Sequence, residues 1–310
     1  MNNIPTVTKN LLVINVVVFL ATYVLENMGV DLNDLLGLHF ILAPDFHFYQ
    51  LFTYMFAHGG WSHIFFNMFA LWMFGCIVER TWGPRKFLFY YIVCGIGAGL
   101  FQELAQFGQF YLLADENLNG FSLSQTMLVA NANASYLNLW TTVGASGAIY
   151  GILLAFGLLY PEERMFIFPL PVPIKAKWFV VGYAAIELFM AFSTRGDGVA
   201  HLAHLGGMVF GFFLIRYWRR NPGLGYNSLG GQQFFDSLRS AWERRTHKPA
   251  GTYGRSSGRA DARRETDWDY NARRKERQAE VDAILDKIRR SGYDSLTAEE
   301  KRKLFDYSRK

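Results

Sequence analysis

Six apolar runs constrain the fold of this chain more than any other feature of its sequence. They lie at residues 11–25, 61–78, 87–106, 139–160, 174–192 and 199–218. Each is close to the ~20 residues that an α-helix needs to cross the hydrocarbon layer of a membrane, the first being somewhat short. A helix pairs its backbone polar groups within itself, which is the condition for crossing lipid. We therefore expect an all-α polytopic membrane protein, with six helices packed as a bundle over residues 1–218.

The residues that flank the first and fifth runs indicate whether the first run is retained and where the fifth span begins. The first run follows a short polar lead with Lys9 and resembles a signal peptide, but no small-x-small cleavage site follows before Glu26. It is therefore expected to remain as an uncleaved first span. Prolines at 169, 171 and 173 cannot continue a helix, so the fifth span is expected to begin near Ile174.

The positions of Lys and Arg predict how the bundle is oriented. Segments 27–60 and 107–138 contain neither residue, whereas the loops on the alternate side are basic, and only Arg195 departs from this pattern. The side rich in Lys and Arg is usually cytosolic. Both termini are therefore predicted to be cytosolic. The compact basic loops and the lack of a transit peptide favour the inner membrane of a bacterium.

The last third of the chain differs in composition from the apolar part. Of the 31 Lys and Arg residues, 22 follow Trp218. Residues 219–270 are rich in Gly, Ser, Arg and Gln, which predicts a flexible basic linker. Residues 271–310 are expected to form a small helical tail, because apolar residues recur there at helical spacing and Thr297 to Glu300 has the form of a capping box. The basic excess favours attraction to anionic lipid over nucleic acid, for which no recognition motif is present.

Polar residues in three of the runs are candidates for a functional site. Ser146 lies in the fourth run among small residues, His204 lies in the sixth, and His63 and Asn67 are one helical turn apart in the second. Closely spaced Gly and Ser in a membrane helix often serve only helix packing. However, the predicted orientation brings these sites towards one leaflet, and ionisable groups within spans usually mark function.

The combination of these residue types matches the needs of nucleophilic catalysis. A serine nucleophile requires a base that takes its proton and donors that hold the oxyanion. Ser146, His204 and the His63–Asn67 pair could fill these roles, and His201 is an alternative base. Close approach of the serine and histidine helices would be permitted by five glycines, Gly147, Gly151, Gly206, Gly207 and Gly211. The fourth and sixth runs hold no carboxylate placed to orient the imidazole, so packing against Tyr150 is expected to do part of that work.

Over roughly residues 10–218 the chain resembles the rhomboid intramembrane serine proteases. The motifs are His63-x-x-x-Asn67, Gly144-Ala145-Ser146-Gly147 and Ala203-His204-x-Gly206-Gly207-x-x-x-Gly211, in the expected order. The resemblance implies that Ser146 is the nucleophile and His204 its base, a dyad without an aspartate. It also implies that His63, Asn67 and the Ser146 backbone N–H form the oxyanion hole, with Gly144 in support, and that Tyr150 stacks on His204.

One departure from the family pattern concerns the first loop. The family often has Trp-Arg where this chain has Tyr49-Gln50, so loop rigidity cannot be argued from that pair.

These observations predict an intramembrane serine endopeptidase that hydrolyses peptide bonds of transmembrane substrates near the outer leaflet. The expected partners are these substrates and the lipid bilayer, with no nucleic acid, no cofactor and no metal. Cys76 and Cys94 lie in apolar runs and are interpreted as small core residues. One alternative is a catalytically silent relative that binds membrane proteins, and another is a transporter that uses the histidines as a polar pathway. The sequence does not indicate an oligomeric state.

Overall fold

The computed structural model describes residues 4–118, 120–166, 172–193 and 200–220, together with six residues near the C-terminus, Ile284, Lys287, Leu296, Thr297, Glu299 and Glu300. The chain divides into two compact units, Met1–Thr246 and His247–Lys310. The linker predicted at residues 219–270 and most of the helical tail predicted at 271–310 lie outside the described residues.

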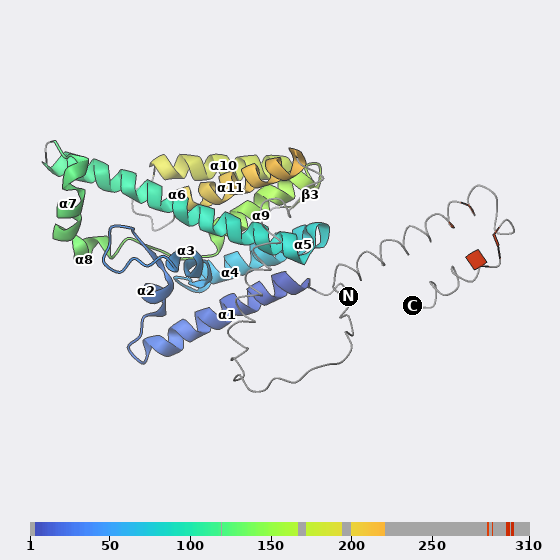
Figure 1. Cartoon of the computed structure of the whole chain (residues 1–310), viewed down its shortest axis with the longest axis horizontal. Coiled ribbons are helices and arrows are strands. Elements are labelled where there is room, and N and C mark those ends of the chain that lie inside the picture. The colour runs from blue at the N-terminus through green and yellow to red at the C-terminus, as the bar shows by residue number, and fades with distance from the viewer. Residues whose placement is uncertain are drawn as a thin grey trace, which may run out of the picture. The chain divides into compact units, whose positions relative to one another are not determined.

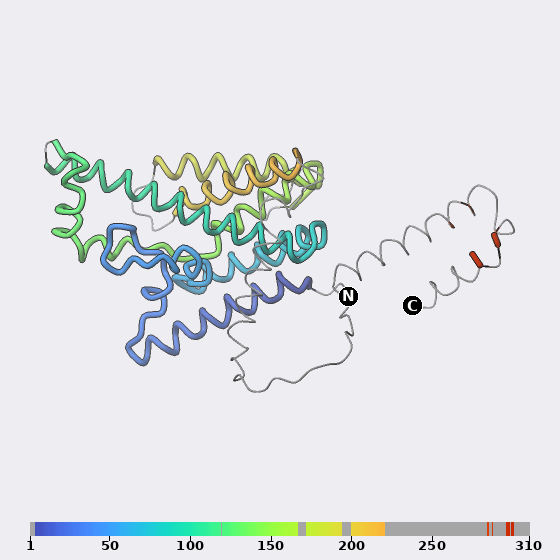
Figure 2. The backbone as a smooth tube through the Cα atoms, viewed as in Figure 1, coloured from blue at the N-terminus to red at the C-terminus, as the bar shows by residue number. Residues whose placement is uncertain are grey.

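The first unit is a bundle of helices (Figures 1 and 2). Its first half contains α1 (Thr6–Glu26), α2 (Leu32–Leu36), β1 (Leu38–His39), α3 (Gln50–Thr53), the 3-10 turn η1 (Tyr54–Phe56), α4 (Trp61–Ala70), the π-helical turn η2 (Leu71–Gly75), α5 (Cys76–Trp82) and α6 (Pro84–Leu118). Its second half contains η3 (Leu123–Gln125), α7 (Thr126–Ala132), α8 (Ala134–Leu137), β2 (Thr141–Thr142), α9 (Ser146–Leu159), β3 (Arg164–Met165), β4 (Ile174–Lys175), α10 (Ala176–Ser193) and α11 (His201–Arg220).

Four helical segments among the described residues are long and apolar enough to cross a membrane. They are Thr6–Glu26, Trp61–Trp82, Pro84–Leu118 and Ala176–Ser193. The apolar helix α9 is shorter, with 14 residues, which is a length of about 21 Å. Helix α11 has 20 residues but ends in several arginines. The prediction of a largely helical, apolar protein is therefore confirmed, while the count of six spans stays a prediction.

The fourth predicted span begins later than the sequence indicates. Helix α9 starts at Ser146, whereas the apolar run starts at residue 139. Thr141 and Thr142 form a short antiparallel strand pair with Leu38 and His39 instead. Gly144 then adopts a φ of 129°, and its N–H donates to the Tyr54 carbonyl at 2.9 Å. Since a side chain rarely adopts that φ, glycine at 144 allows the chain to turn into α9.

Helices α6, α9 and α11 pack against one another at the centre of the bundle (Figure 1). Their interface contains fully buried large side chains such as the aromatic Tyr90 on α6 and the aliphatic Ile152 on α9. Cys76 and Cys94 are both buried and free, which confirms their interpretation as core residues. The tight packing of α9 and α11 fixes the distance between Ser146 and His204.

The start of α1 is held by a buried carboxylate from α5. Glu79 accepts hydrogen bonds from the N–H groups of Val7 at 3.0 Å and Thr8 at 2.7 Å, and from the Thr8 hydroxyl at 2.7 Å. The first N–H groups of a helix have no partner within the helix, and a negative charge there is favourable. Glu79 therefore fastens α1 to α5.

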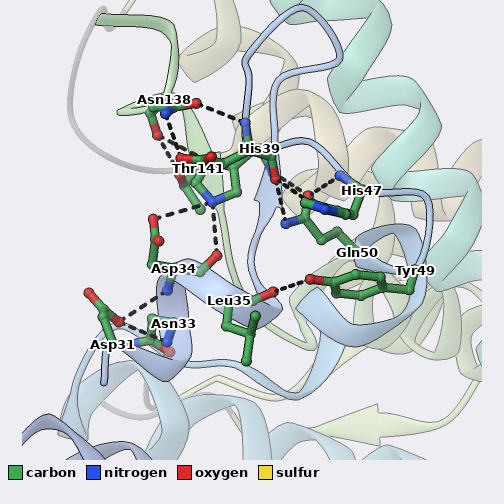
Figure 3. Close-up of polar contacts among 11 residues, drawn as sticks. Asp31, Asn33, Asp34, Leu35, His39, His47, Tyr49, Gln50, Asn138 and Thr141 are labelled. Atoms are coloured by element: carbon green, nitrogen blue, oxygen red, sulfur yellow. Dashed lines mark hydrogen bonds and ion pairs between the residues drawn. The ribbon is translucent and has the colours of Figure 1, made fainter. Parts of the chain in front are cut away.

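The loop between α2 and α3 is held by a polar network around His39 and Gln50 (Figure 3). His39 is fully buried, and its ring nitrogens contact the carbonyl oxygens of Asn138 at 3.1 Å and Asp34 at 2.8 Å. The Gln50 side chain accepts from the His47 N–H at 2.9 Å and donates to the Asp45 carbonyl at 3.0 Å. The Tyr49-Gln50 pair thus holds this loop through Gln50, although it departs from the family pattern.

Residues 107–118 and 120–138 form a small folded cap at one end of the bundle. They comprise the last turns of α6 with η3, α7 and α8 (Figure 1). A separate apolar cluster holds the cap together, formed by Phe40, Ala43, Phe110, Ala114, Phe121, Ala130 and Leu137. Because Phe40 follows β1 directly, the cluster also ties the cap to the strand pair that precedes Ser146.

The few described residues of the second unit agree with the predicted capping box. The Thr297 N–H donates to Glu300 at 2.7 Å, and the Glu300 N–H donates to the Thr297 hydroxyl at 3.3 Å. This reciprocal pair is the arrangement of a capping box, so that prediction is confirmed. Glu300 also accepts from the Lys287 ammonium at 2.9 Å.

Candidate functional site

Ser146 occupies the first position of α9. The preceding N-cap residue is Ala145, which has no side-chain oxygen to accept from the first N–H groups of the helix. Those N–H groups and the helix dipole therefore favour negative charge beside Ser146. Ser146 is half-buried, whereas Ala145 and Gly147 are fully buried. The serine side chain is thus the accessible part of this turn.

His204 on α11 lies in hydrogen-bond contact with Ser146. The distance from His204 Nε2 to Ser146 Oγ is 2.8 Å, and the exposed fraction of His204 is 8%. If the serine hydroxyl donates in this bond, Nε2 is unprotonated and the ring proton lies on Nδ1. Nδ1 of the alternative base, His201, lies 2.6 Å from Glu187 Oε2 instead.

Tyr150 lies one turn after Ser146 on α9 and covers the face of the histidine ring. The ring centroids of Tyr150 and His204 are 4.2 Å apart, and the ring planes are within 8° of parallel. Stacking of this kind restricts rotation of the imidazole. The residue expected to orient His204 is therefore in contact with it.

His63, at the start of α4, lies on the other side of the Ser146 turn. A Cβ atom built on Gly144 would be 2.7 Å from His63 Nε2 and 3.6 Å from Ser146 Oγ. The Gly59 N–H donates to His63 Nδ1 at 3.4 Å. Because Nδ1 is then the acceptor, a neutral ring carries its proton on Nε2. Nε2 is thus a hydrogen-bond donor directed at the space beside Gly144.

Asn67 lies one turn after His63 and is buried, with an exposed fraction of 6%. Its side-chain Nδ2 has no hydrogen-bond partner among the described residues. Buried donors are nearly always paired in native proteins, so an unpaired donor calls for an explanation. Asn67 Nδ2 is thus a buried donor available for a hydrogen bond.

Glu187 is a site residue that is not predicted from the sequence, because it lies in the fifth apolar run, outside the two runs that hold Ser146 and His204. Glu187 lies on α10, is buried, and places Oε2 2.6 Å from His201 Nδ1 and 3.0 Å from His204 Nδ1. Its Oε1 accepts a hydrogen bond from the Tyr150 hydroxyl. The sequence does contain an indication of its role. Glu187 is the single acidic residue in the fifth run, and ionisable residues within a membrane span usually mark function.

Glu187, His201 and His204 also form a group of ligand types that suit a transition metal. One ligand atom from each residue lies within 4.8 Å of the others. Imidazole nitrogen and carboxylate oxygen are common ligands of zinc and iron. Direct contacts among the three residues account for their positions without an ion. The prediction that the protein uses no metal is not tested by this geometry.

His58 lies in the loop before α4, next to the site. Its ring is in edge contact with His63, with centroids 5.1 Å apart, and its exposed fraction is 1%. Burial, followed by the nearby His63 ring, lowers the pKa of His58 from 6.5 to about 4. The His58 ring is therefore neutral at neutral pH.

The fold and the site define a helical membrane protein with a serine and a histidine in contact between two central helices. Residues 45–221 match the model of the rhomboid domain family, which is more than half of the chain. The chain therefore belongs to the rhomboid family. Residues 265–310 match a family of unknown function (DUF6576).

Three curated relatives are similar to this chain over part of its length. Rhomboid protease AarA of Providencia stuartii is 30% identical over 160 residues, 51% of this chain and 51% of the relative. Rhomboid-like protein 16, chloroplastic, of Arabidopsis thaliana is 28% identical over 211 residues, 67% of this chain and 61% of the relative. Rhomboid protein 1, mitochondrial, of Saccharomyces cerevisiae is 29% identical over 158 residues, 50% of this chain and 38% of the relative. The chain thus spans only about two fifths to three fifths of these relatives.

Proposed function

We propose that this protein is an intramembrane serine endopeptidase that hydrolyses peptide bonds of transmembrane substrates near the outer leaflet. The observation that carries the proposal is the 2.8 Å contact between Ser146 Oγ and His204 Nε2, with Tyr150 stacked on His204. Membership of the rhomboid family and relatives named as rhomboid proteases support the same activity.

In the proposed reaction, Ser146 Oγ attacks the carbonyl carbon of the substrate while its proton passes to His204 Nε2. His204 then gives that proton to the leaving amine, and an acyl-enzyme ester remains on Ser146. Water attacks the ester, with His204 as the base again, and the serine recovers its proton. The cycle leaves the protein unchanged and consumes one water for each peptide bond.

The oxyanion formed in both steps would be held by three donors. His63 Nε2 points at the space beside Gly144, Asn67 has an unpaired Nδ2, and the Ser146 backbone N–H lies at the start of α9. Donors fixed in advance at such a position typically supply about 3 kcal/mol each to the transition state. No cofactor is required for this chemistry.

We further propose that α9 and α11 complete a six-span bundle, with both termini in the cytosol of a bacterium and Ser146 towards the outer side. The absence of Lys and Arg from residues 27–60 and 107–138 supports this orientation. Residues 1–218 would then be the protease domain, residues 219–270 a cytosolic linker and residues 271–310 a helical tail. The capping box at Thr297 supports a helix in the tail.

The test is cleavage of a single-span substrate by the purified protein in liposomes. The parent should cleave it and react with a fluorophosphonate probe, whereas Ser146→Ala and His204→Ala should each lose at least about 1000-fold in rate. Ser135→Ala, at an exposed serine on α8, is the matched control and should keep parental activity. If the parent cleaves none of several substrates and does not react with the probe, the protein is a silent member of the family that binds membrane proteins.

A further inference from the structure

Glu187 connects three helices at the candidate site. Its own helix is α10, its Oε1 accepts from Tyr150 on α9, and its Oε2 contacts His201 and His204 on α11. A buried carboxylate is costly unless several donors surround it. The hydroxyl of Tyr150 and the two imidazoles supply those donors.

The rest of α10 packs weakly against the bundle. Of its described residues only Ala176, Val180 and Glu187 are buried, and the large apolar side chains beyond Val180 are exposed except for the half-buried Met190. Glu187 is therefore the one buried residue among those described in the last half of this helix, and it contacts both α9 and α11. A group retained for packing alone would be apolar, since an apolar residue of similar volume costs less to bury.

The position of Glu187 relative to His204 matches the role of the third residue in a serine hydrolase triad. Nε2 of His204 faces Ser146 at 2.8 Å, and Nδ1 lies 3.0 Å from Glu187 Oε2. The Nδ1 contact is within ion-pair distance but lacks the alignment of a hydrogen bond in this state. A small rotation of the imidazole would align it. The carboxylate then favours the tautomer with the proton on Nδ1 and stabilises the imidazolium formed when Ser146 is deprotonated.

We propose that Glu187 is a positioning residue that extends the Ser146–His204 pair to a triad. It would act through His204, keeping its negative charge while the proton moves from Ser146 to Nε2. Tyr150 and His201 would fix the carboxylate by donating to its two oxygens. The inference rests on the proposed function. It adds that the His204 ring has the orientation and tautomer of a base only when α10 lies against α9 and α11.

The first test compares Glu187→Gln with the parent in liposomes, using the single-span substrate. Glutamine keeps the shape but removes the charge and places an amide N–H₂ among donors. We expect kcat to fall about 100-fold or more, with KM within about threefold of the parent. Glu116→Gln, at an exposed glutamate on α6, is the matched control and should change neither constant. A folded Glu187→Gln protein with a kcat within threefold of the parent overturns the proposal.

A second measurement needs no folded Glu187 variant. In the parent protein labelled with ¹⁵N-histidine, nuclear magnetic resonance at neutral pH should show His204 protonated on Nδ1 and not on Nε2, with His204→Ala used for assignment. Protonation on Nε2 instead would overturn the proposal. If the parent shows the expected tautomer but neither cleaves substrate nor reacts with the probe, the proposed function fails while the contact with Glu187 stands.

Discussion

Gly207 on α11 meets the backbone of Gly147 on α9 so closely that α11 has no room for a side chain at this crossing. A Cβ atom built on Gly207 would be 1.9 Å from the carbonyl oxygen of Gly147. The obstacle is backbone, so no side-chain rotation relieves it. The same crossing carries Ser146 and His204, each within three residues of it.

Gly207→Ala should therefore impair both stability and activity. The two helices must separate to admit the methyl group, which we expect to lower the free energy of unfolding by about 2 kcal/mol. A shift of about 1 Å between Ser146 and His204 should reduce kcat about 100-fold. The measurements are thermal unfolding in detergent and cleavage in liposomes. Gly108→Ala is the matched control, because a Cβ there meets nothing within 4 Å. If both variants unfold at the same temperature and cleave at the same rate, the close packing of α9 on α11 at Gly207 is contradicted.

The residues around Ser146 differ in how far the sequence predicts them. Ser146, His204 and His63 could be predicted because helical spacing and the order of the motifs place them at matching ends of three apolar runs. Glu187 could not be placed by the same argument. A single glutamate in an apolar run does not show which other helix packs against the side of the helix that carries it. The contact of Glu187 with His204 depends on how α10 packs on α11.

The start of α9 is a second feature that sequence alone does not provide. Residues 139–145 are mostly apolar and continue the run that follows, so hydropathy extends the helix through them. Thr141 and Thr142 are extended instead, because they pair with Leu38 and His39, about a hundred residues earlier. Strand pairing at that separation is a tertiary effect that overrides local preference. Gly144, a residue type that tolerates the positive φ found there, is a local sign of the boundary.

His58 should make the folded protein less stable as the pH falls. Its pKa is about 4 in the folded protein and 6.5 in the unfolded chain, so the unfolded state binds the proton first. Stability attributable to His58 is complete above pH 6.5, decreases between pH 6.5 and 4, and is lost below 4, with a total of about 3 kcal/mol. His58→Asn should flatten this part of the profile. The measurement is the unfolding temperature of the parent and of His58→Asn in detergent from pH 7.5 to 4. If the unfolding temperatures of the two proteins fall in parallel with pH, His58 does not cause the loss of stability.

Glu79 should contribute to stability and not to chemistry. Removing its carboxylate leaves the N–H groups of Val7 and Thr8 and the Thr8 hydroxyl without their buried acceptor. Glu79→Ala should therefore lower the free energy of unfolding by about 2–3 kcal/mol, because α1 loses its attachment to α5. The protein that remains folded should cleave substrate at the parental kcat, since Glu79 lies at the opposite end of the Trp61–Trp82 segment from His63.

Two comparisons make this prediction specific. Glu163→Ala removes an exposed glutamate in the turn after α9 and should leave the unfolding temperature within about 1 °C of the parent. Thr8→Val removes only the hydroxyl bond and should cost about 1 kcal/mol, less than Glu79→Ala, because both backbone N–H groups keep their acceptor. A Glu79→Ala protein as stable as Glu163→Ala would show that the contact does not hold α1. A loss of kcat at full folding would instead place Glu79 in the catalytic machinery.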